Sequence, residues 1–440
     1  MKLFIQLTVL FIAFISHKHE AIAISNLTYT SFVFPVNKHT DAAKTLYSIN
    51  LMTTFVNMQF SHANFLIDIE GPLTWHDCIL LWSTDPETSC PKDKLCKSPI
   101  SCEEVECTRF RANSFEKSSC PPMTNRSTSP GWGFCTCPVN LKNPINGNCV
   151  QPELNGDSFA ANASDGRNPF LVYHDINIYA ACAPSNSFTS FPTNVSGVMA
   201  FSNSPYALPA YYSRSSIKAS VALCLPSTSS ANGVLFFGSG PFYLLPHSDV
   251  DLRSLLSYTP LLKRPDSFSY FIGVNAIVIK HRSIDVVGTT TTKLSTTEPY
   301  TTLKTDIYNW VIRRYSVVTK RMLRADPIAP FSLCYRSNID GTQADVNFPD
   351  IEFSLPDGKN WTIYTSNLIK QVTNDVACLA FVDGGATSEH AIVIGTFQME
   401  DNFLHFDIEN LSLGFSSSLL NKDTSCANFN FTTGSMDMYP

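Results

Sequence analysis

Apolar residues in this chain gather in short runs that are separated by Gly, Pro, Asn and Ser, and long helical periodicity is scarce. β-Branched and aromatic runs of this kind predict strands, which we expect at 64–69, 234–237, 270–280, 361–364, 391–394 and 411–415. One helix is predicted from Lys304 to Arg314, because Ile307, Trp310 and Val311 fall on one face. The pattern predicts an all-β protein, and the chain length favours two β lobes over one small sandwich.

A faint internal repeat supports the division into two lobes. Residues 65–75 run from an apolar strand through Asp68 into a turn, and residues 293–303 have the same outline, with Ser295 in the turn. Each loop is followed, further along the chain, by a second apolar strand, at 197–202 and at 391–395. Two copies of a loop and a strand are what a duplicated fold requires.

The start of the chain has the features of a secretory signal. Met1-Lys2 precedes an apolar stretch from Leu3 to Ile15 and a small-residue site at 21–23. We therefore expect a signal peptide at 1–23, an N-terminal lobe at 24–220 and a C-terminal lobe at 221–440. No later stretch is apolar for long enough to cross a bilayer, so we expect a secreted, extracellular protein without a membrane partner.

The cysteines predict a disulfide-rich insertion. Fourteen cysteines in an exported chain indicate disulfides, because that compartment oxidises thiols. Nine of them fall at 78–149, in a Pro/Ser/Thr-rich stretch of the first lobe with little strand signal. An odd number cannot close on itself, so at least one must bond outside the stretch. A competing interpretation is a zinc site built from Cys102, Cys107, Cys135 and Cys137.

Other surface features agree with an exported protein. Seven Asn-x-Ser/Thr acceptors indicate a glycoprotein, and they are Asn26, Asn125, Asn162, Asn194, Asn360, Asn410 and Asn430. The net charge of −6, with 15% charged residues, gives no basic footprint for nucleic acid. We expect no metal and no cofactor, and the sequence leaves the oligomeric state open.

Asp68 is the candidate for catalysis, and its loop lacks a partner. The run from Phe65 to Trp75 resembles the first active-site loop of a pepsin-like aspartic protease, with Ile69 and Glu70 in place of the hydroxyl residue and the glycine. Such proteases need two carboxylates that share one proton. The position that answers Asp68 in the second loop is Ser295, whose hydroxyl is not acidic.

Glu70 is not expected to replace the missing aspartate. It follows Asp68 by two positions in the same loop, whereas the catalytic pair is built across the two lobes. Its bulk and charge should instead disturb the loop. No serine-hydrolase elbow, zinc-protease motif, P-loop or Rossmann pattern is present, and we expect His76-Asp77 and His174-Asp175 to be solvated loop pairs.

Longer segments carry a resemblance that covers nearly the whole mature chain. They include 165–169, 222–225, 233–246, 270–274, 330–335 and, most distinctively, 394–417. On these segments the chain resembles a plant subgroup of pepsin-like proteins: the extracellular dermal glycoproteins, basic 7S globulins, and xylanase or xyloglucanase inhibitors. The resemblance implies a bilobal pepsin-like fold of two β-barrel lobes, and the disulfides Cys78–Cys182, Cys224–Cys426 and Cys334–Cys378.

The resemblance also implies a function, with alternatives. Members of the subgroup bind and inhibit microbial cell-wall-degrading glycoside hydrolases in the apoplast, so we expect a pseudo-protease with a glycoside hydrolase as protein partner. The expected binding loops are 383–390, with Asp383, Glu389 and His390 as candidates, and the turn at 337–342. An imidazole would be attracted to the paired carboxylates of a hydrolase. The competing interpretation, which the sequence favours over a contact role, is that His390 is an exposed turn residue next to the strand at Ala391. An atypical aspartic endopeptidase and a storage or peptide-binding glycoprotein are the alternatives.

Overall fold

The structure is a computed structural model that describes residues 29–432 apart from 43, 55–59, 82–89, 92–93, 114–119, 121–134, 213–216, 248, 287–290 and 337–347. The expected signal peptide, Asn26, Asn125 and the turn at 337–342 lie outside the described residues. In the described part of the chain, no helix is long and apolar enough to cross a membrane.

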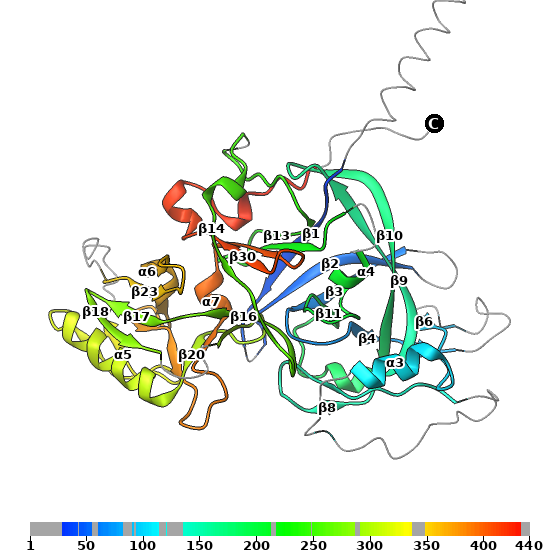
Figure 1. Cartoon of the computed structure of the whole chain (residues 1–440), viewed down its shortest axis with the longest axis horizontal. Helices are drawn as coiled ribbons and strands as arrows, with labels where there is room; N and C mark the ends of the chain where they lie inside the picture. Colours follow the sequence, from blue (N-terminus) through cyan, green and yellow to red (C-terminus); the bar gives the residue numbers. More distant parts are fainter. Residues whose placement is uncertain are drawn as a thin grey trace, which may run out of the picture.

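A twelve-stranded sheet joins the two halves of the chain (Figure 1). In spatial order its strands are β10 (Pro169–Ala183), β4 (Trp75–Asp77), β11 (Val195–Ala200), β3 (Phe60–Asp68), β2 (Leu46–Thr54), β9 (Glu153–Ser164), β1 (Ser31–His39), β13 (Gly233–Gly238), β12 (Ser220–Cys224), β29 (Phe403–Asp407), β30 (Ser412–Phe415) and β14 (Ser257–Pro260). The predicted boundary at 220/221 falls at the first residue of β12, inside this shared sheet. The division into lobes at that residue stays a prediction.

The second half adds three smaller sheets. The first contains β15 (Leu262–Arg264), β16 (Ser267–Gly273), β19 (Thr291–Leu294), β28 (Ile392–Ile394), β20 (Thr301–Leu303) and β27 (Phe381–Asp383). The second contains β18 (Arg282–Asp285), β17 (Ala276–Ile279), β23 (Ile351–Ser354) and β24 (Asn360–Ile363). The third contains β21 (Arg324–Ala325), β22 (Cys334–Arg336), β26 (Val376–Leu379) and β25 (Ile369–Gln371).

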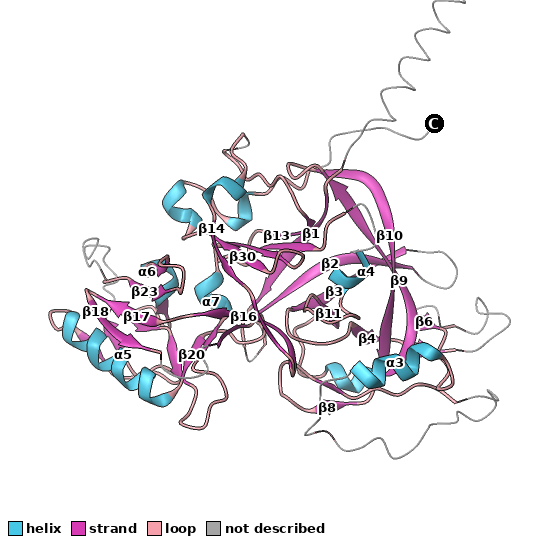
Figure 2. Ribbon diagram, in the orientation of Figure 1, coloured by secondary structure: helices cyan, strands magenta, loops and turns pink. Residues whose placement is uncertain are grey.

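Helices are short, and one of them, α7 (Thr396–Met399), is buried near the middle of the molecule (Figure 2). They are α3 (Val105–Asn113), α4 (Leu208–Tyr212), α5 (Thr305–Val318), α6 (Thr365–Leu368) and α7 (Thr396–Met399), with 3₁₀ turns η2 (Ser185–Phe188), η3 (Leu252–Leu255), η4 (Leu419–Lys422) and η5 (Cys426–Asn428). α5 and α3 lie at opposite ends of the long axis. The predicted helix at 304–314 is confirmed and runs four residues further, because Tyr315 extends its buried face.

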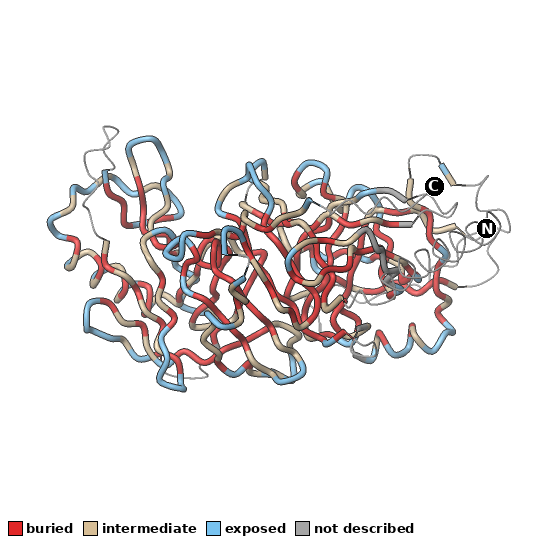
Figure 3. The backbone as a smooth tube through the Cα atoms, turned by 90° about the horizontal axis from the view of Figure 1, so that it is seen from above, coloured by how far each residue is buried: buried red, intermediate tan, exposed pale blue. Residues whose placement is uncertain are grey.

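The predicted all-β class with a bilobal pepsin-like fold is confirmed. The run at 270–280 was wrong as a single strand: β16 and β17 separate at Val274 and Asn275 and enter different sheets. Buried positions follow the strands, and exposed positions follow the connecting loops (Figure 3). One apolar core includes Phe65 and Ile67 of the first half as well as Leu294 and Ile394 of the second.

All fourteen cysteines are paired. The three pairs implied by the resemblance are present: Cys78–Cys182, Cys224–Cys426 and Cys334–Cys378. The insertion is closed by Cys90–Cys96, Cys102–Cys135, Cys107–Cys137 and Cys120–Cys149, and it also contains α3 and the two-stranded sheets of β5 (Ile79–Leu80) with β6 (Cys96–Lys97) and β7 (Leu141–Lys142) with β8 (Cys149–Val150). The zinc interpretation was wrong, because all four proposed ligands are in disulfides.

Candidate functional site

The two predicted loops occupy matching places in the fold. β3 ends at Asp68 and lies parallel to β11, with Asp68 opposite Ala200. β19 precedes Ser295 and lies parallel to β28, and the Ser295 amide donates to the carbonyl of Ile394 at 3.0 Å. The internal repeat that the sequence indicates is therefore confirmed as two loops, each supported by a parallel strand from further along the chain.

The backbone holds Asp68 and Ser295 in the same way. Oδ1 of Asp68 accepts hydrogen bonds from the amides of Glu70 at 2.8 Å and Gly71 at 2.9 Å. Oγ of Ser295 accepts hydrogen bonds from the amides two and three residues further on, at 3.3 and 3.1 Å. Both side chains are buried, Asp68 with 5% and Ser295 with 0% of its surface exposed. Each loop therefore presents two N–H groups to one acceptor oxygen, whether that oxygen belongs to a carboxylate or a hydroxyl.

Gly71 allows the first loop to fold over its carboxylate. A Cβ atom at this position would lie 2.4 Å from Oδ2 of Asp68, which is shorter than any tolerated contact. The backbone carbonyl of Gly71 also accepts a hydrogen bond from Oγ of Ser202 at 2.7 Å. The close approach needed at this turn is therefore provided by the glycine after Glu70.

The two loops are also joined by hydrogen bonds between the Thr296 hydroxyl of the second loop and the backbone of the first. Oγ1 of Thr296 donates to the carbonyl of Ile67 at 2.6 Å and accepts from the amide of Ile69 at 3.3 Å. Ile69 holds the equivalent place in the first loop and has no hydroxyl, so it cannot return the contact. Of these two positions, only Thr296 in the second loop therefore supplies a side-chain hydroxyl to the contact between the loops.

Glu70 reaches across to the second loop, and the expectation that its place in the chain prevents this was wrong. One carboxylate oxygen accepts hydrogen bonds from the hydroxyls of Ser295 and Thr297, and the other is ion-paired with Lys293. The Glu70 and Lys293 side chains are 16% and 21% exposed. Glu70 extends from a turn rather than from a strand, which lets its side chain cross the interface that Asp68 faces.

The charges at this site oppose one another. Burial and the negative charge of Glu70 raise the pKa of Asp68 to about 6, against the two amide bonds and the charge of Lys293. Burial alone would lower the pKa of Lys293, but the charge of Glu70 and the bond to it raise the pKa above its ordinary value. Lys293 therefore remains a cation and compensates Glu70, while the Asp68 carboxyl holds its proton more tightly than an ordinary aspartate.

This arrangement differs from that of an aspartic protease. A shared proton requires two carboxylates of which neither is already neutralised by a cation. Here the second-loop position carries the Ser295 hydroxyl, and both oxygens of Glu70 are engaged, one by hydroxyls and one by Lys293. Glu70 is therefore held by two hydroxyls and a cation of the second loop, and not in a proton-sharing pair with Asp68.

The candidate residues of the 383–390 loop differ in their contacts and in their exposure to solvent. Asp383 is exposed, and its Oδ1 accepts bonds from Oγ1 of Thr305 at 2.7 Å and the amide of Gly385 at 2.9 Å. Glu389 is 69% exposed, with Oε1 at 3.2 Å from an Arg264 nitrogen. Asp383 therefore organises the loop and the start of α5, whereas Glu389 is presented on the surface.

His390 is turned inward. Its side chain is 15% exposed and its ring lies 5.5 Å from the ring of Phe271, so it is not an exposed turn residue. Burial and the charge of Lys293 lower the pKa of His390, against the opposing charge of Glu389. A contact role for this imidazole stays a prediction, since the ring would have to leave its place on Phe271.

Sequence reasoning missed Arg264 as part of this surface. It ends β15, packs its guanidinium 5.5 Å from the centre of the Phe271 ring, and lies 2.9 Å from Asp266 as well as beside Glu389. The signal was the turn Arg264-Pro265-Asp266 between two apolar runs. Only the folded structure brings that turn next to a loop more than a hundred residues away.

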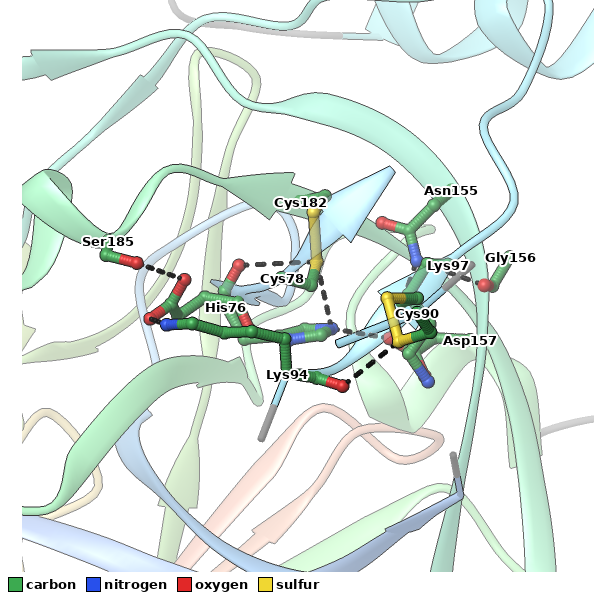
Figure 4. Close-up of a disulfide and its surroundings, with 12 residues drawn as sticks. His76, Cys78, Cys90, Lys94, Lys97, Asn155, Gly156, Asp157, Cys182 and Ser185 are labelled. Carbon is green, nitrogen blue, oxygen red and sulfur yellow. Dashed lines mark hydrogen bonds and ion pairs between the residues drawn. A yellow bond between two sulfur atoms is a disulfide. The ribbon is translucent and has the colours of Figure 1, made fainter. Parts of the chain in front are cut away.

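A second buried polar network lies in the first half (Figure 4). Nε2 of His76 lies 2.5 Å from Oδ2 of Asp157, and Lys97 is ion-paired with the other carboxylate oxygen. Burial would raise the pKa of Asp157, but the charges and bonds of His76 and Lys97 bring it below its ordinary value. The expectation of a solvated His76-Asp77 pair was wrong, because His76 is fully buried. The side chains of His174 and Asp175 lie outside the described residues.

Comparison with known proteins identifies the family. A sequence model described as "Xylanase inhibitor N-terminal" matches residues 51–239, and one described as "Xylanase inhibitor C-terminal" matches residues 269–417. The chain is 34% identical to "Gamma conglutin 1" of Prunus dulcis and 32% identical to "Chitinase CLP" of Oryza sativa subsp. japonica, over 91% and 89% of this chain and 90% of each relative. The chain belongs to this plant family of xylanase-inhibitor and 7S-globulin proteins, built on an aspartic-peptidase-like fold.

Solved structures agree with the family. The structure described as "Crystal structure of edgp" superposes with a TM-score of 0.76 at 29% identity, covering 92% of this chain and 99% of that one. Conglutin gamma from lupine seeds, described there as a basic 7S globulin, also gives a TM-score of 0.76, at 26% identity over 93% of this chain and all of that one. Another curated relative, "Probable aspartic proteinase GIP2" of Nicotiana benthamiana, is 31% identical over 91% of this chain and 92% of its own length.

Proposed function

We propose that this protein is a secreted, catalytically inactive aspartic-protease homologue that binds and inhibits microbial cell-wall-degrading glycoside hydrolases in plant defence. The main support for an inactive protease is the Glu70 network. Ser295 stands at the second-loop position, and the Glu70 carboxylate that reaches Ser295 is neutralised by Lys293. Family membership supports the inhibitory role, because both family models are described as xylanase inhibitor.

The proposed contact surface is the 383–390 loop together with the turn between β15 and β16. Glu389 and Arg264 are in contact there. Because the His390 side chain is turned inward, Arg264 supplies the cation that this proposal requires. A glycoside hydrolase carries a pair of carboxylates in its active site, so an approaching guanidinium would be attracted to them. In this proposal His390 supports the loop through Phe271, and Asp383 fixes its other end.

Glycosylation is part of the proposal for an exported protein. Asn194, Asn360 and Asn410 are exposed in the structure, whereas Asn162 and Asn430 are half-buried. Because an occupied site must accommodate a bulky glycan at the surface, we expect occupancy at the first three before the other two. Peptide mapping of the protein purified from plant tissue checks this order.

Titration of the purified protein against a panel of microbial endoxylanases and xyloglucan-specific endoglucanases tests the inhibitory role. We expect loss of hydrolase activity and a stable complex for at least one enzyme. Full activity of the whole panel with this protein in excess would refute the proposal. Active-site mutants of each hydrolase separate binding from inhibition.

A matched pair of variants locates the contact. Arg264→Gln should weaken inhibition at least tenfold, because it removes the proposed cation, whereas Lys142→Gln, at the exposed residue of β7, should leave inhibition unchanged. Equal inhibition by both variants would place the contact elsewhere on the molecule. Comparison of their thermal midpoints shows whether loss of the Glu389 contact has altered the fold.

An atypical aspartic endopeptidase is the alternative, and the observation in its favour is that burial and the nearby Glu70 carboxylate raise the pKa of Asp68 to about 6. That function requires acid-pH peptide cleavage that a statine-type inhibitor stops and that Asp68→Ala abolishes. A storage or peptide-binding role, favoured by the relatives named conglutin and 7S globulin, requires neither cleavage nor inhibition.

A further inference from the structure

The second half carries a concentration of positive charge that the composition of the whole chain hides. Residues 280–324 contain nine Lys and Arg against three Asp and Glu, in a chain whose net charge is −6. Lys293 belongs to the Glu70 network, and Lys304 precedes α5. The remaining cations gather around the C-terminal half of α5. The absence of a basic footprint, inferred from net charge, therefore does not hold locally.

Hydrogen bonds show that three separate segments meet at this place. The guanidinium of Arg314, on α5, donates to the carbonyls of Ile279 at 3.2 Å and Lys280 at 3.0 Å, which fixes the tip of the β17–β18 hairpin against the helix. The guanidinium of Arg324, at the start of β21, donates to the carbonyl of Ser316 at 2.7 Å, which fixes the chain after the helix. α5 and the hairpin lie together at one end of the long axis (Figure 1).

We define the basic surface as Lys280, Arg282, Arg313, Arg314, Lys320 and Arg321. All are exposed except Arg314, which is half-buried. Among the described residues, no carboxylate lies within ion-pairing distance of any of the six, whereas nearby Arg336 lies 3.9 Å from Asp375. Cations at the end of a helix stabilise its last carbonyls, but one or two suffice for that. The surplus is an electrostatic feature that needs another explanation.

The shape and chemistry of the basic surface favour a long anion over a small one. Arg313 and Lys320 are separated by about 10 Å if the helical rise is continued between them, and the hairpin adds Lys280 and Arg282 alongside. Cations spread in this way contact several negative groups of one chain. Four of the six are arginines, whose planar forks match carboxylates in a bidentate manner.

The neighbouring apolar side chains argue against a membrane. Val317 and Leu323 are 61% and 60% exposed between the cations, and they are the only large hydrophobic side chains exposed on this part of the described chain. Two isolated aliphatic groups give too little apolar area for membrane insertion, whereas they can pack against the C–H faces of sugar rings. We propose that the basic surface binds an acidic polysaccharide, a linear polymer of uronate residues. This binding does not depend on inhibition of a hydrolase.

Binding of the full-length mature protein to immobilised polygalacturonate, measured from low to moderate salt, tests the proposal. We expect affinity to fall steeply with salt, because each cation that pairs with a carboxylate releases a counterion. Fully methyl-esterified polymer and neutral arabinoxylan should not bind. No binding to polygalacturonate at low salt, or equal binding to the esterified polymer, would overturn the proposal.

Two variants with the same change in net charge locate the site. Arg313→Gln/Lys320→Gln/Arg321→Gln should bind at least tenfold more weakly, with a shallower dependence on salt. Lys142→Gln/Lys218→Gln/Lys263→Gln, at exposed positions elsewhere, should bind within twofold of the natural protein. Equal loss in both would show that only net charge matters, and the basic surface would then have no special role. Circular dichroism confirms that both variants are folded.

Other polyanions provide the remaining comparison. Anionic phospholipid vesicles and single-stranded DNA should compete with polygalacturonate only weakly, and equal or stronger binding to either would overturn the assignment to a uronate polymer. Because Arg264 and the 383–390 loop are not altered, the triple variant of the basic surface should inhibit a sensitive hydrolase as the natural protein does. If the triple variant instead lost inhibition but kept polymer binding, the hydrolase contact proposed at Arg264 and the 383–390 loop would be wrong.

Discussion

The Asp68 and Ser295 loops share a backbone arrangement but have opposite electrostatic consequences. Each directs two amides, from the residues two and three positions further on, at one buried oxygen. That arrangement requires an acceptor and not a charge, so a hydroxyl satisfies it as well as a carboxylate. Loop geometry and catalytic group are therefore separable: the fold needs an oxygen at each position, and only catalysis needs two carboxylates.

Glu70 makes the comparison asymmetric. It extends from the first loop to the second, where it meets Ser295, and Lys293 of the second half neutralises it. Asp68 is therefore held by the amides of its own loop, next to the contacts of Glu70 with Ser295 and Lys293. If the two loops are separable in this sense, changes to the carboxylate of the first loop should affect stability through charge, and changes to the second loop should affect it through hydrogen bonds.

The largest effect is expected for Asp68→Asn, which should stabilise the protein at pH 7 by up to about 3 kcal/mol. Below its ordinary pKa of 3.8 the carboxyl is protonated in both folded and unfolded chains. As pH rises to about 6, the folded chain keeps a proton that the unfolded chain has lost, so natural Asp68 destabilises the fold increasingly. The asparagine avoids this cost and keeps its acceptor oxygen.

Thermal midpoints at pH 4 and pH 7 measure this difference. The gain for Asp68→Asn should be present at pH 7 and nearly absent at pH 4, whereas Asp285→Asn, at an exposed position on β18, should change neither. Equal midpoints for the natural and Asp68→Asn proteins at pH 7 would show that the ionised Asp68 carboxylate does not destabilise the folded protein.

Lys293→Met should destabilise the protein by about 2 kcal/mol, because it leaves the largely buried Glu70 carboxylate without its cation and next to Asp68. The double variant Glu70→Gln/Lys293→Met should recover most of the loss, since the uncompensated charge is gone. Denaturant unfolding of the natural protein, both single variants and the double variant forms the test, and additive losses in the double variant would contradict a coupled pair.

Ser295→Ala should cost about 1.5 kcal/mol, because the amides of Thr297 and Glu298 and one Glu70 oxygen lose a partner in a buried site. The loss should be independent of pH between 5 and 8, in contrast to the pH-dependent gain expected for Asp68→Asn. The exposed Ser283→Ala variant is the control. A strongly pH-dependent loss for Ser295→Ala would show that the second loop also acts through charge.

The smallest effect is expected for Thr296→Val, about 1 kcal/mol, since the bonds to the amide of Ile69 and the carbonyl of Ile67 are lost while the shape is kept. Thr387→Val, at an exposed loop position, should have no measurable effect. Guanidinium unfolding midpoints compare the two variants, and unchanged stability of Thr296→Val would mean that the one-sided contact between the loops carries no energy.

Strands and loops with strong local signals were predictable from the sequence. The strand that ends at Asp68 and the helix that begins near Lys304 follow from apolar periodicity, which is a local property. The break between β16 and β17 was missed, because two strands can be continuous in sequence and still enter different sheets. The helix α3 was missed as well, since its residues have little amphipathic pattern and disulfides hold it in place.

The sites divide in the same way. The sequence alone shows that residue 295 is a serine, so that no carboxylate exists at this position of the second loop. The directions of the Glu70 and His390 side chains are not visible in the sequence, because each depends on neighbours from the other half of the chain or from another loop. Arg264 was missed for the same reason, whereas the basic surface was missed because the net charge of the whole chain hides the local excess of Lys and Arg at 280–324.

By itself, the sequence determined the all-β class, the duplicated loops, the oxidised cysteines and the presence of a serine, not an aspartate, at position 295. These depend on residue type and on periodicity along the chain. Tertiary structure decided that Glu70 crosses to Ser295, that Lys293 compensates it, that His390 turns inward, and that cations from three segments meet on α5. Electrostatic and hydrogen-bonding energies depend on distance in space, which residue order does not specify.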